Sequence, residues 1–343
     1  MTNFNSSLLE NARRLHFIGV GGSGMYPLVQ ILAARDFAIS GSDVNEGSII
    51  DAERAMGVRV FMGHDAANVE GADLVIYSAA IPQDNPELVA ARELGIPAIE
   101  RSVLLGYVTS LYPNSICVAG THGKTTTTAM ITQVLEMAGR DPAAVIGGKL
   151  PLINSYGKNG SGREIVVEAC EYARTFLHLA PAISVLLNID ADHLEYYGSM
   201  ENLKEAFHRF CLLTTHTIIA NADDANTFSI INSLDRHVRT FAINTAADYT
   251  AVNIQEYKPG FYSFDVMELT RPFAHIRLGL PGYHHIYNAL AACAVARLCK
   301  IPSAQAAEGI EAFTGAGRRF EVMGEVNGVT IADDYAHHPT ELE

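Results

Sequence analysis

The sequence predicts an α/β protein: an N-terminal Rossmann-like doubly wound parallel sheet, followed by a P-loop ATPase-type α/β domain with an added antiparallel sheet. Three observations predict this fold class. The apolar run at residues 15–20 leads directly into a glycine-rich loop, and a second run at 115–119 leads into the loop Gly120–Thr128, which contains Lys124. A strand, a glycine loop and a helix in this order are typical of nucleotide-binding domains. Residues 249–280 instead alternate between apolar and polar, as antiparallel strands do.

Composition narrows the class of protein. A chain of 343 residues is long enough for two or three domains, and 48% hydrophobic residues with 18% charged residues is typical of a folded protein. The net charge of −14 argues against nucleic-acid and membrane-surface partners. No signal peptide and no membrane span of about 20 apolar residues is recognisable. We therefore expect a cytoplasmic protein, a monomer or weak homodimer.

The cysteines carry no pattern of a disulfide framework or a zinc site. Their number is odd, and no CxxC pair occurs, which favours reduced thiols. We expect them to be packing residues. They are Cys117, Cys170, Cys211, Cys293 and Cys299.

The first predicted domain covers residues 1–107. Its glycines Gly19, Gly21 and Gly24 fit the GxGxxG spacing, and Asp43 follows the second strand, where an acidic side chain can bind a ribose hydroxyl. The pattern suits a nucleotide diphosphate but does not separate a dinucleotide from a sugar nucleotide, and a glycine turn without a ligand is the alternative. Strands are predicted at 15–20, 37–42, 59–61, 73–78 and 97–99, and helices at 25–34, 49–56 and 86–94.

The second predicted domain covers residues 108–316, because turn residues at 107–115 indicate a boundary. Its strands and helices follow the same alternation up to residue 246, after which the antiparallel strands begin. Beyond the phosphate loop, strands are predicted at 163–168, 182–189 and 217–220, and helices at 129–138, 200–213 and up to residue 298.

The loop between the first strand and helix of this domain is a candidate triphosphate site. The N–H groups near Gly120 and Gly123 can turn onto phosphate oxygens, Lys124 can reach the β- and γ-phosphates, and the Thr125 hydroxyl can bind Mg²⁺. Only two glycines flank the turn, so the spacing is tighter than usual. A plain glycine turn with a surface lysine is the alternative. Four consecutive threonines at 125–128 argue against it, since they are poor helix formers and good phosphate ligands.

Two acidic or histidine side chains follow the next predicted strands. Glu168 ends the strand at 163–168 and could complete the Mg²⁺ shell with Thr125. His193, one strand later, could be a metal ligand or could orient a phosphate. A solvent-exposed acid and a turn histidine are the respective alternatives.

The segment 317–343 begins a new strand. Arg318 and Arg319 could stabilise a transferred phosphoryl group, because guanidinium matches phosphate bidentately, or could be a surface pair. His337 and His338 lie beside two aspartates in a predicted binding loop, but their spacing does not match a zinc site.

Taken together, these residues resemble the Mur ligase family of ATP-dependent, amide-bond-forming enzymes over essentially the whole chain. The resemblance rests on motifs at 19–25, 41–43, 120–128, 168–171, 188–193, 282–292, 318–320 and 333–340.

The resemblance implies three sets of site residues. A UDP-sugar is expected at Gly19, Gly21, Gly22, Ser23, Gly24, Met25, Ser42, Asp43, His64 and Ser78. ATP is expected at Gly120, Thr121, Gly123, Lys124, Thr125, Thr126, Asn288, Arg319 and Asp334. Mg²⁺ or Mn²⁺ is expected at Thr125, Glu168 and His193, and the residues expected to act in catalysis are Lys124, His122, Glu168 and His193, with His122 near the lactyl carboxylate.

The implied substrates are UDP-N-acetylmuramate, ATP and L-alanine. ATP would phosphorylate the lactyl carboxylate, and the amine of L-alanine would attack the acyl phosphate. Later-acting ligases carry a carbamylated lysine where this chain has Phe207, which favours the alanine-adding branch or the related muropeptide-recycling branch. The short segment at 176–181 favours alanine addition.

Three departures from the family pattern stand out. Cys170 replaces a common aspartate, and His285 replaces an asparagine expected to contact the nucleotide. The chain also ends soon after residue 317, where the family's third domain begins. We therefore expect a truncated chain that binds its substrates but turns over poorly. A nicotinamide-dependent oxidoreductase, which would rest on the first glycine loop and Asp43 alone, and a non-catalytic nucleotide-binding regulator remain as alternatives.

Overall fold

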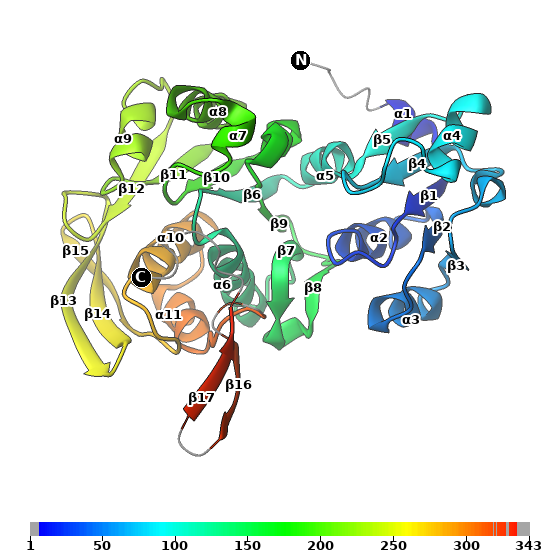
Figure 1. The fold of residues 1–343 in the computed structure, drawn as a ribbon. Coiled ribbons are helices and arrows are strands. Elements are labelled where there is room, and N and C mark those ends of the chain that lie inside the picture. The colour runs from blue at the N-terminus through cyan, green and yellow to red at the C-terminus, as the bar shows by residue number, and fades with distance from the viewer. Residues whose placement is uncertain (1–6, 318, 320, 327–328, 335–343) are drawn as a thin grey trace.

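A computed structural model describes residues 7–317, 319, 321–326 and 329–334, which form two sheets with flanking helices and a C-terminal hairpin (Figure 1). Of the sequence-based expectations, those for Arg318, His337 and His338 lie outside the described residues. Within these residues, no helix combines the length and the apolar character that crossing a bilayer requires.

The N-terminal sheet has five parallel strands in the order β3-β2-β1-β4-β5. The chain winds away from β1 in both directions, so a crevice opens outside the carboxyl ends of β1 and β4. The strands are β1 (Arg14–Ile18), β2 (Ala38–Asp43), β3 (Arg59–Met62), β4 (Leu74–Tyr77) and β5 (Ala98–Glu100). The helices are α1 (Ser7–Asn11), α2 (Tyr26–Ala33), α3 (Ser48–Ala55), η1 (Ala66–Val69), α4 (Pro86–Glu93) and α5 (Arg101–Ser110).

The second sheet has ten strands in the order β15-β14-β13-β12-β11-β10-β6-β9-β7-β8. Its strands are β6 (Asn114–Ala119), β7 (Ala143–Leu150), β8 (Ser155–Lys158), β9 (Glu164–Glu168), β10 (Ile183–Leu186), β11 (Thr217–Asn221), β12 (Val238–Ala242), β13 (Tyr249–Lys258), β14 (Phe261–Glu268) and β15 (Arg271–Arg277). Its helices are α6 (Lys124–Met137), η2 (Pro151–Ile153), η3 (Tyr172–His178), α7 (Leu194–Tyr197), α8 (Met200–Leu213), α9 (Ala225–Ile231), α10 (His285–Leu298) and α11 (Ser303–Glu311). A separate hairpin joins β16 (Glu321–Val326) to β17 (Val329–Asp333).

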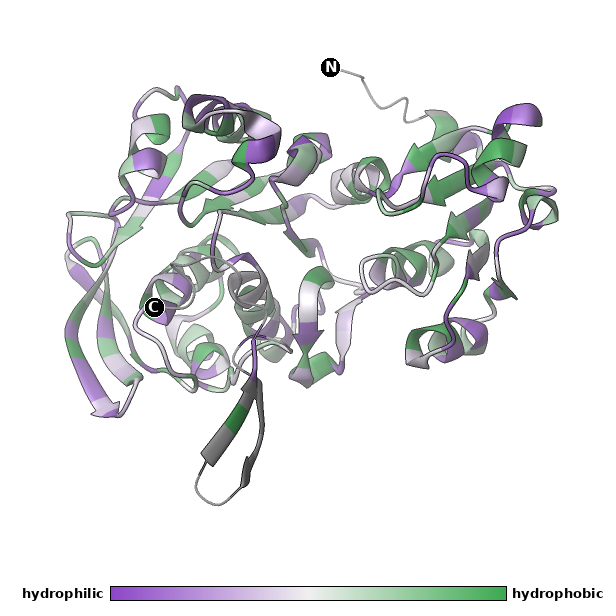
Figure 2. Ribbon diagram, viewed as in Figure 1, coloured by the Kyte–Doolittle hydropathy of each residue, from purple (hydrophilic) through white to green (hydrophobic). Residues whose placement is uncertain are grey.

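The central parallel strands of the second sheet, β6, β9, β10 and β11, are buried on both faces, which explains their continuous apolar runs. In β6, Ile116 and Val118 join the core that contains α6, α10 and α11, while Cys117 and Ala119 join the core on the opposite face. Figure 1 shows α6, α10 and α11 together on one side of the sheet and α7, α8 and α9 on the other. Figure 2 shows hydrophobic residues concentrated on the strands and the inner helices. Alternate side chains of one strand therefore fill two cores.

The predicted fold class is confirmed, with a refinement. The antiparallel strands β14 and β15 extend the large sheet through β13, which pairs with β12 in parallel. Residues 107–110 belong to α5, so the turn expected from Tyr107 begins only after Ser110. The domain limits at 107/108 and 316/317 stay a prediction.

The cysteine expectation holds for four residues and is wrong for one. Cys117, Cys211, Cys293 and Cys299 are buried, and burial raises the pKa of Cys299 to about 12. Cys170 is exposed. It lies two residues beyond the carboxyl end of β9.

Phe207 is a core residue at the position where the family resemblance implies a carbamylated lysine in later-acting ligases. Its ring is fully buried on α8 and meets Phe176 edge-on at a centroid distance of 5.2 Å. Replacing Phe207 with alanine is expected to lower the free energy of unfolding by about 3–5 kcal/mol, through lost burial and the cavity left behind. Chemical denaturation measures this change. A loss below about 1 kcal/mol would mean that the helix repacks to close the cavity.

Glu53 on α3 is a buried carboxyl group whose two oxygens lack hydrogen-bond partners among the described residues. Burial, with the charge of Asp43 as a smaller contribution, raises the pKa of Glu53 to about 8. The folded state therefore holds a proton that the unfolded chain releases near pH 4.5. Stability contributed by this proton is present at low pH and is lost as the pH rises to about 8.

The Glu53→Gln variant should be about as stable as the original protein at pH 5 and more stable at pH 9. Between pH 5 and 8 the difference should grow by up to about 1.4 kcal/mol per pH unit. Thermal melting at a series of pH values tests this, and parallel curves for the two proteins would contradict it.

Candidate nucleotide-binding sites

The loop after β1 forms one wall of a cavity of about 320 Å³. The backbone N–H of Gly21 donates to Asp43 Oδ2 at 2.9 Å, which holds the loop against the end of β2. A Cβ atom at Gly21 would lie 2.9 Å from Ile50 Cδ1, so a side chain here would require the Ile50 side chain to move. The cavity is lined by Gly21, Gly22, Asp43 and residues 45–50.

The remaining residues of the predicted UDP-sugar set lie around this loop in different environments. Ser23 is exposed, and Ser78 follows the carboxyl end of β4. The side chains of Met25 and Ser42 are buried, so they shape the site without reaching into it. Ser42 Oγ lies 3.0 Å from His64 Nδ1.

Arg101 also lies beside the glycine loop, and it is not among the residues predicted from the sequence. Its guanidinium lies 3.3 Å from the position that a Cβ atom would take at Gly24, so it brings positive charge to the glycine loop. An anionic diphosphate would be stabilised there. The signal that could have found it is its place directly after β5, at the carboxyl end of a parallel strand.

Substitution of Gly21 tests the role of the first loop. Gly21→Ala adds a Cβ atom within 3.1 Å of the Ile50 and Asp43 side chains, so one of these side chains or the loop must shift where the ligand would lie. UDP-N-acetylmuramate is expected to bind about tenfold more weakly, as measured by calorimetry. Affinity for an ATP analogue is the control and should be unchanged. Unaltered UDP-sugar affinity would show that the ligand does not use this loop.

The second loop lies at the corresponding point of the large sheet. It follows β6, whose neighbours are β9 on one side and β10 on the other, so a crevice opens above it. Gly123 has φ of +83°, a left-handed conformation that glycine adopts without strain, and α6 begins at the next residue. A Cβ atom at Gly123 would lie 3.1 Å from Asn288 Oδ1, which places Asn288 beside the loop.

The four threonines at 125–128 differ from expectation. They lie within α6 and not ahead of it. Thr127 and Thr128 are completely buried, so they are not available as phosphate ligands. Packing of α6 against the sheet offsets the low helix propensity of threonine.

Lys124 lies across the loop and is fully engaged. Its Nζ donates to the carbonyl oxygens of Gly120 at 2.7 Å and Thr121 at 3.0 Å, and to Glu171 Oε1 at 2.9 Å. Burial alone would lower the pKa of Lys124, but the charges of Glu171 and Glu168 outweigh it and raise the pKa. The side chain therefore stays charged.

Thr125 and Glu168 meet as predicted from their places at the ends of α6 and β9. Thr125 Oγ1 donates to Glu168 Oε2 at 2.8 Å, and the N–H of Gly147 donates to the same oxygen at 3.0 Å. Arg319 Nη2 lies 3.5 Å from Thr125 Oγ1, so this arginine of the C-terminal segment reaches the phosphate loop.

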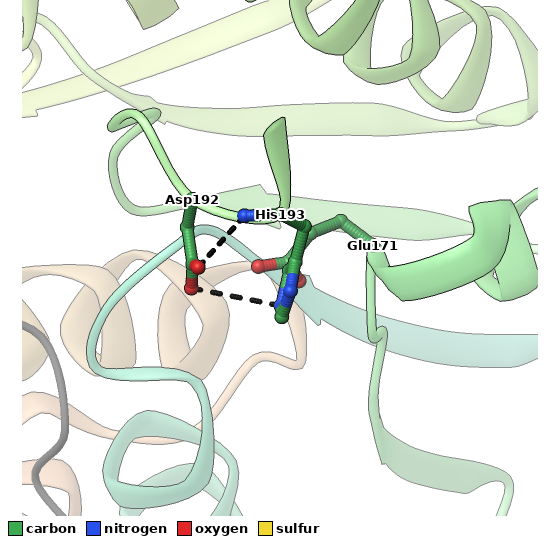
Figure 3. Close-up of side chains that lie close together, drawn as sticks. All are labelled: Glu171, Asp192 and His193. Carbon is green, nitrogen blue, oxygen red and sulfur yellow. Dashed lines mark hydrogen bonds and ion pairs between the residues drawn. The ribbon is translucent and has the colours of Figure 1, made fainter. Parts of the chain in front are cut away.

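Figure 3 shows a cluster of Glu171, Asp192 and His193 beside this loop. One potential ligand atom from each residue lies within 4.8 Å of the others. Glu171 Oε2 is buried and has no hydrogen-bond partner in the described part of the chain. A buried orphan acceptor is costly unless a cation or donor completes it, and two carboxylates with an imidazole are suitable ligands for a divalent cation.

This trio differs from the metal set expected from sequence. His193 belongs to both, but Glu168 lies with Thr125 and is not one of the three clustered residues. Glu171 and Asp192 were not assigned as metal ligands, although both lie within the motifs at 168–171 and 188–193. Their adjacency in space depends on β6 lying between β9 and β10.

His122 is fixed to the loop that follows β10. Its N–H donates to Asn188 Oδ1 at 2.8 Å, and Asn188 Nδ2 donates back to the His122 carbonyl at 3.1 Å. His122 Nε2 lies 3.3 Å from Asp190 Oδ2. Asn188 is another residue to which the sequence assigned no role, and its paired bonds hold the phosphate loop to the loop after β10.

His285, which stands where the family pattern has an asparagine, is the first residue of α10. His285 is buried, with Nδ1 3.0 Å from Asn288 Nδ2. Burial, with the nearby His284 as a smaller contribution, lowers the pKa of His285 well below its usual value, so the neutral ring can accept from Asn288. Asp334 is close enough to His284 to favour its charged form, although burial lowers the pKa of His284 overall.

These features are typical of a P-loop nucleotide-binding protein that also has a Rossmann-like domain. Residues 14–112 match the Mur ligase family catalytic domain, and residues 118–296 match the Mur ligase middle domain. The UDP-N-acetylmuramate–L-alanine ligase of Caldanaerobacter subterraneus subsp. tengcongensis is 43% identical over 336 residues, covering 97% of this chain and 73% of the relative. The enzyme of the same name from Acetivibrio thermocellus is 41% identical, covering 96% and 71%.

Two solved structures of ligases have a similar fold. The crystal structure of UDP-N-acetylmuramate-alanine ligase from Thermotoga maritima aligns with a TM-score of 0.81 at 29% identity, over 96% of this chain and 75% of that one. A murein peptide ligase from Psychrobacter arcticus aligns with a TM-score of 0.82 at 25% identity, covering 96% and 74%. The chain belongs to the Mur ligase family, a family of ATP-dependent enzymes that form amide bonds.

Proposed function

We propose that this chain binds UDP-N-acetylmuramate on its N-terminal domain and ATP on its central domain, and joins L-alanine to the lactyl carboxylate. The observation that carries the proposal is the phosphate loop at the switch point of the large sheet. There Lys124 contacts Glu171, and Thr125 contacts Glu168. The relatives at 40–43% identity bear the name of that reaction.

The proposed reaction has two steps. A lactyl carboxylate oxygen attacks the γ-phosphorus of ATP, the bond to the β-phosphate oxygen breaks, and ADP leaves. The amine of L-alanine then attacks the acyl carbon, inorganic phosphate leaves, and the nitrogen loses a proton to give the amide. The barrier to the first step is repulsion between a carboxylate and a triphosphate, so the site must offset negative charge.

The residues of this chain are suited to that task. Lys124 would exchange its contacts with the Gly120 and Thr121 carbonyls for the β- and γ-phosphates. Arg319, near Thr125, would neutralise charge on the transferred group. His122, held by Asn188, would orient the lactyl carboxylate, and Asn288 would contact the nucleotide.

A divalent cation, Mg²⁺ or Mn²⁺, fits two neighbouring donor sets. Thr125 and Glu168 form one, and Glu171, Asp192 and His193 form the other, with the orphan oxygen of Glu171 as the strongest indication. When bound, the cation supplies positive charge next to the phosphates.

Calorimetric titration tests the proposal. Micromolar binding of UDP-N-acetylmuramate and of a non-hydrolysable ATP analogue, without binding of NADH, is the expected result. NADH binding without UDP-sugar binding would overturn it in favour of the oxidoreductase alternative, which the family assignment does not support. Alanine-dependent phosphate release by the whole protein would eliminate a non-catalytic regulator, and its absence would favour one. Release that depends on a peptide and not on alanine would indicate the muropeptide-recycling branch.

A further inference from the structure

The N-terminal domain contains a buried carboxylate, Glu87, that takes no part in the proposed reaction steps. Glu87 lies in the first turn of α4 and is completely buried. A buried charge is costly unless several groups compensate it, and Glu87 is surrounded by donors. Ser42 Oγ donates to its Oε2 at 2.6 Å, and Asn68 Nδ2 donates to its Oε1 at 2.6 Å.

The third partner is His64, which the family resemblance places near uridine. His64 Nδ1 lies 3.0 Å from Glu87 Oε2 and 3.0 Å from Ser42 Oγ. The Ser42 hydroxyl proton is already directed at Glu87. If Nδ1 carried a lone pair, it would face a carboxylate oxygen at hydrogen-bond distance, which is repulsive. Nδ1 must therefore carry a proton and donate it.

The charge state of Glu87 supports this arrangement. Burial alone would raise the pKa of Glu87, but contacts with His16, Ser42 and Asn68 outweigh it and hold the pKa below the usual value. The carboxylate is therefore ionised and accepts from Ser42 and Asn68. With Nδ1 used, the other nitrogen of His64, Nε2, is the one left for a ligand, and the side chain is 19% exposed.

We propose that Glu87 is a positioning residue that fixes His64 in the Nδ1–H tautomer, so that Nε2 accepts a hydrogen bond from the uridine part of the substrate. The inference rests on the proposed function, which supplies the ligand. Uridine offers two kinds of donor: the N3–H of uracil and the ribose hydroxyls. Both suit an acceptor nitrogen. An N–H at Nε2 would oppose the N3–H of uracil, whereas a ribose hydroxyl can also accept from that N–H.

The Glu87→Gln variant reverses the pattern without changing the size of the side chain. Its carbonyl oxygen would keep the bond from Asn68, which turns the amide N–H groups toward Ser42 and His64. An N–H group facing Nδ1 favours a lone pair there and moves the proton to Nε2. The acceptor for uridine is then lost.

Nitrogen NMR of ¹⁵N-histidine-labelled protein at pH 8 reads the tautomer directly, with the His64 signal assigned by its loss in His64→Gln. We expect Nδ1–H in the original protein and Nε2–H in Glu87→Gln. By calorimetry, UDP should bind about tenfold more weakly to Glu87→Gln, while an ATP analogue binds equally. An Nε2–H tautomer in the original protein, or unchanged UDP affinity in the variant, would overturn the inference.

A matched control separates positioning from loss of structure. Asn85 caps α4 by accepting from the N–H groups of Glu87 and Leu88, and within the described residues no hydrogen bond joins its side chain to His64. Asn85→Ala should lower the melting temperature but leave the tautomer and UDP affinity unchanged. If it weakens UDP binding as much as Glu87→Gln does, the effect is structural and the inference is wrong.

Two further binding measurements identify the donor group and test the proposed function separately. CDP lacks the N3–H donor, so a strong preference for UDP over CDP would assign the bond to uracil, and equal binding would assign it to the ribose. Failure of UDP to bind the original protein would count against the proposed function, and the NMR tautomer would still decide whether Glu87 controls His64.

Discussion

The Lys124→Ala variant is expected to lose affinity for an ATP analogue by about 100-fold while binding UDP-N-acetylmuramate normally. A charge-assisted hydrogen bond to phosphate is worth about 1.5–3 kcal/mol, and Lys124 is placed to make more than one. The proposed UDP-sugar site lies on the five-stranded N-terminal sheet, whereas Lys124 follows β6 of the ten-stranded sheet. The affinity for UDP-N-acetylmuramate should therefore stay unchanged. Calorimetry with each ligand separately measures both effects.

The variant needs a stability control, because Lys124 also neutralises a buried acid. Removing it leaves Glu171, whose side chain is 1% exposed, without its cation. Lys124→Arg keeps the positive charge and should melt close to the original protein. Equal loss of both ligands from a Lys124→Ala protein that still melts cooperatively would show that the two sites have been assigned to the wrong domains.

The His193→Ala variant is expected to bind Mn²⁺ about 100-fold more weakly than the original protein. It removes one of three ligands from the cluster in Figure 3, and the two remaining carboxylates cannot replace a directional imidazole. Electron paramagnetic resonance of free Mn²⁺ measures the affinity without requiring turnover. Alanine-dependent phosphate release should fall in parallel.

His208 provides the matched control for this experiment. It lies on α8, outside the cluster, so His208→Ala removes an imidazole without removing a ligand. Its Mn²⁺ affinity should be unchanged. If His193→Ala retains full Mn²⁺ affinity while Glu168→Gln loses it, the cation occupies the Thr125 and Glu168 pair, and the trio has another role.

Much of the fold could be predicted from sequence because the strand, glycine loop and helix pattern is local. The runs at β1 and β6 end at glycines, and each is followed by a helix, as expected. The elements that were missed have weaker local signals. Helix α5 lies where turn residues suggested a boundary, and β7 contains two glycines that argue against a strand. Both are stabilised by packing that no local pattern records.

The candidate site was predictable only where a motif carried it. Lys124, Thr125 and Glu168 follow from the loop and from the strand that pairs with β6, and the structure brings Thr125 and Glu168 together. Glu171 lies in the motif at 168–171, but its role could not be assigned, because that role depends on which way a carboxylate points beyond the end of a strand. Glu87 is further removed: its contact with Ser42 joins residues 45 positions apart.

The shared position of Glu171 links the nucleotide and the cation thermodynamically. One of its oxygens accepts from Lys124, the other has no hydrogen-bond partner among the described residues, and Glu171 lies in the cluster with Asp192 and His193. A cation that draws Glu171 away from Lys124 would release the ammonium for the triphosphate, so binding of either should strengthen binding of the other. Such cooperativity is reciprocal: the factor by which Mn²⁺ tightens the ATP analogue must equal the factor by which the analogue tightens Mn²⁺.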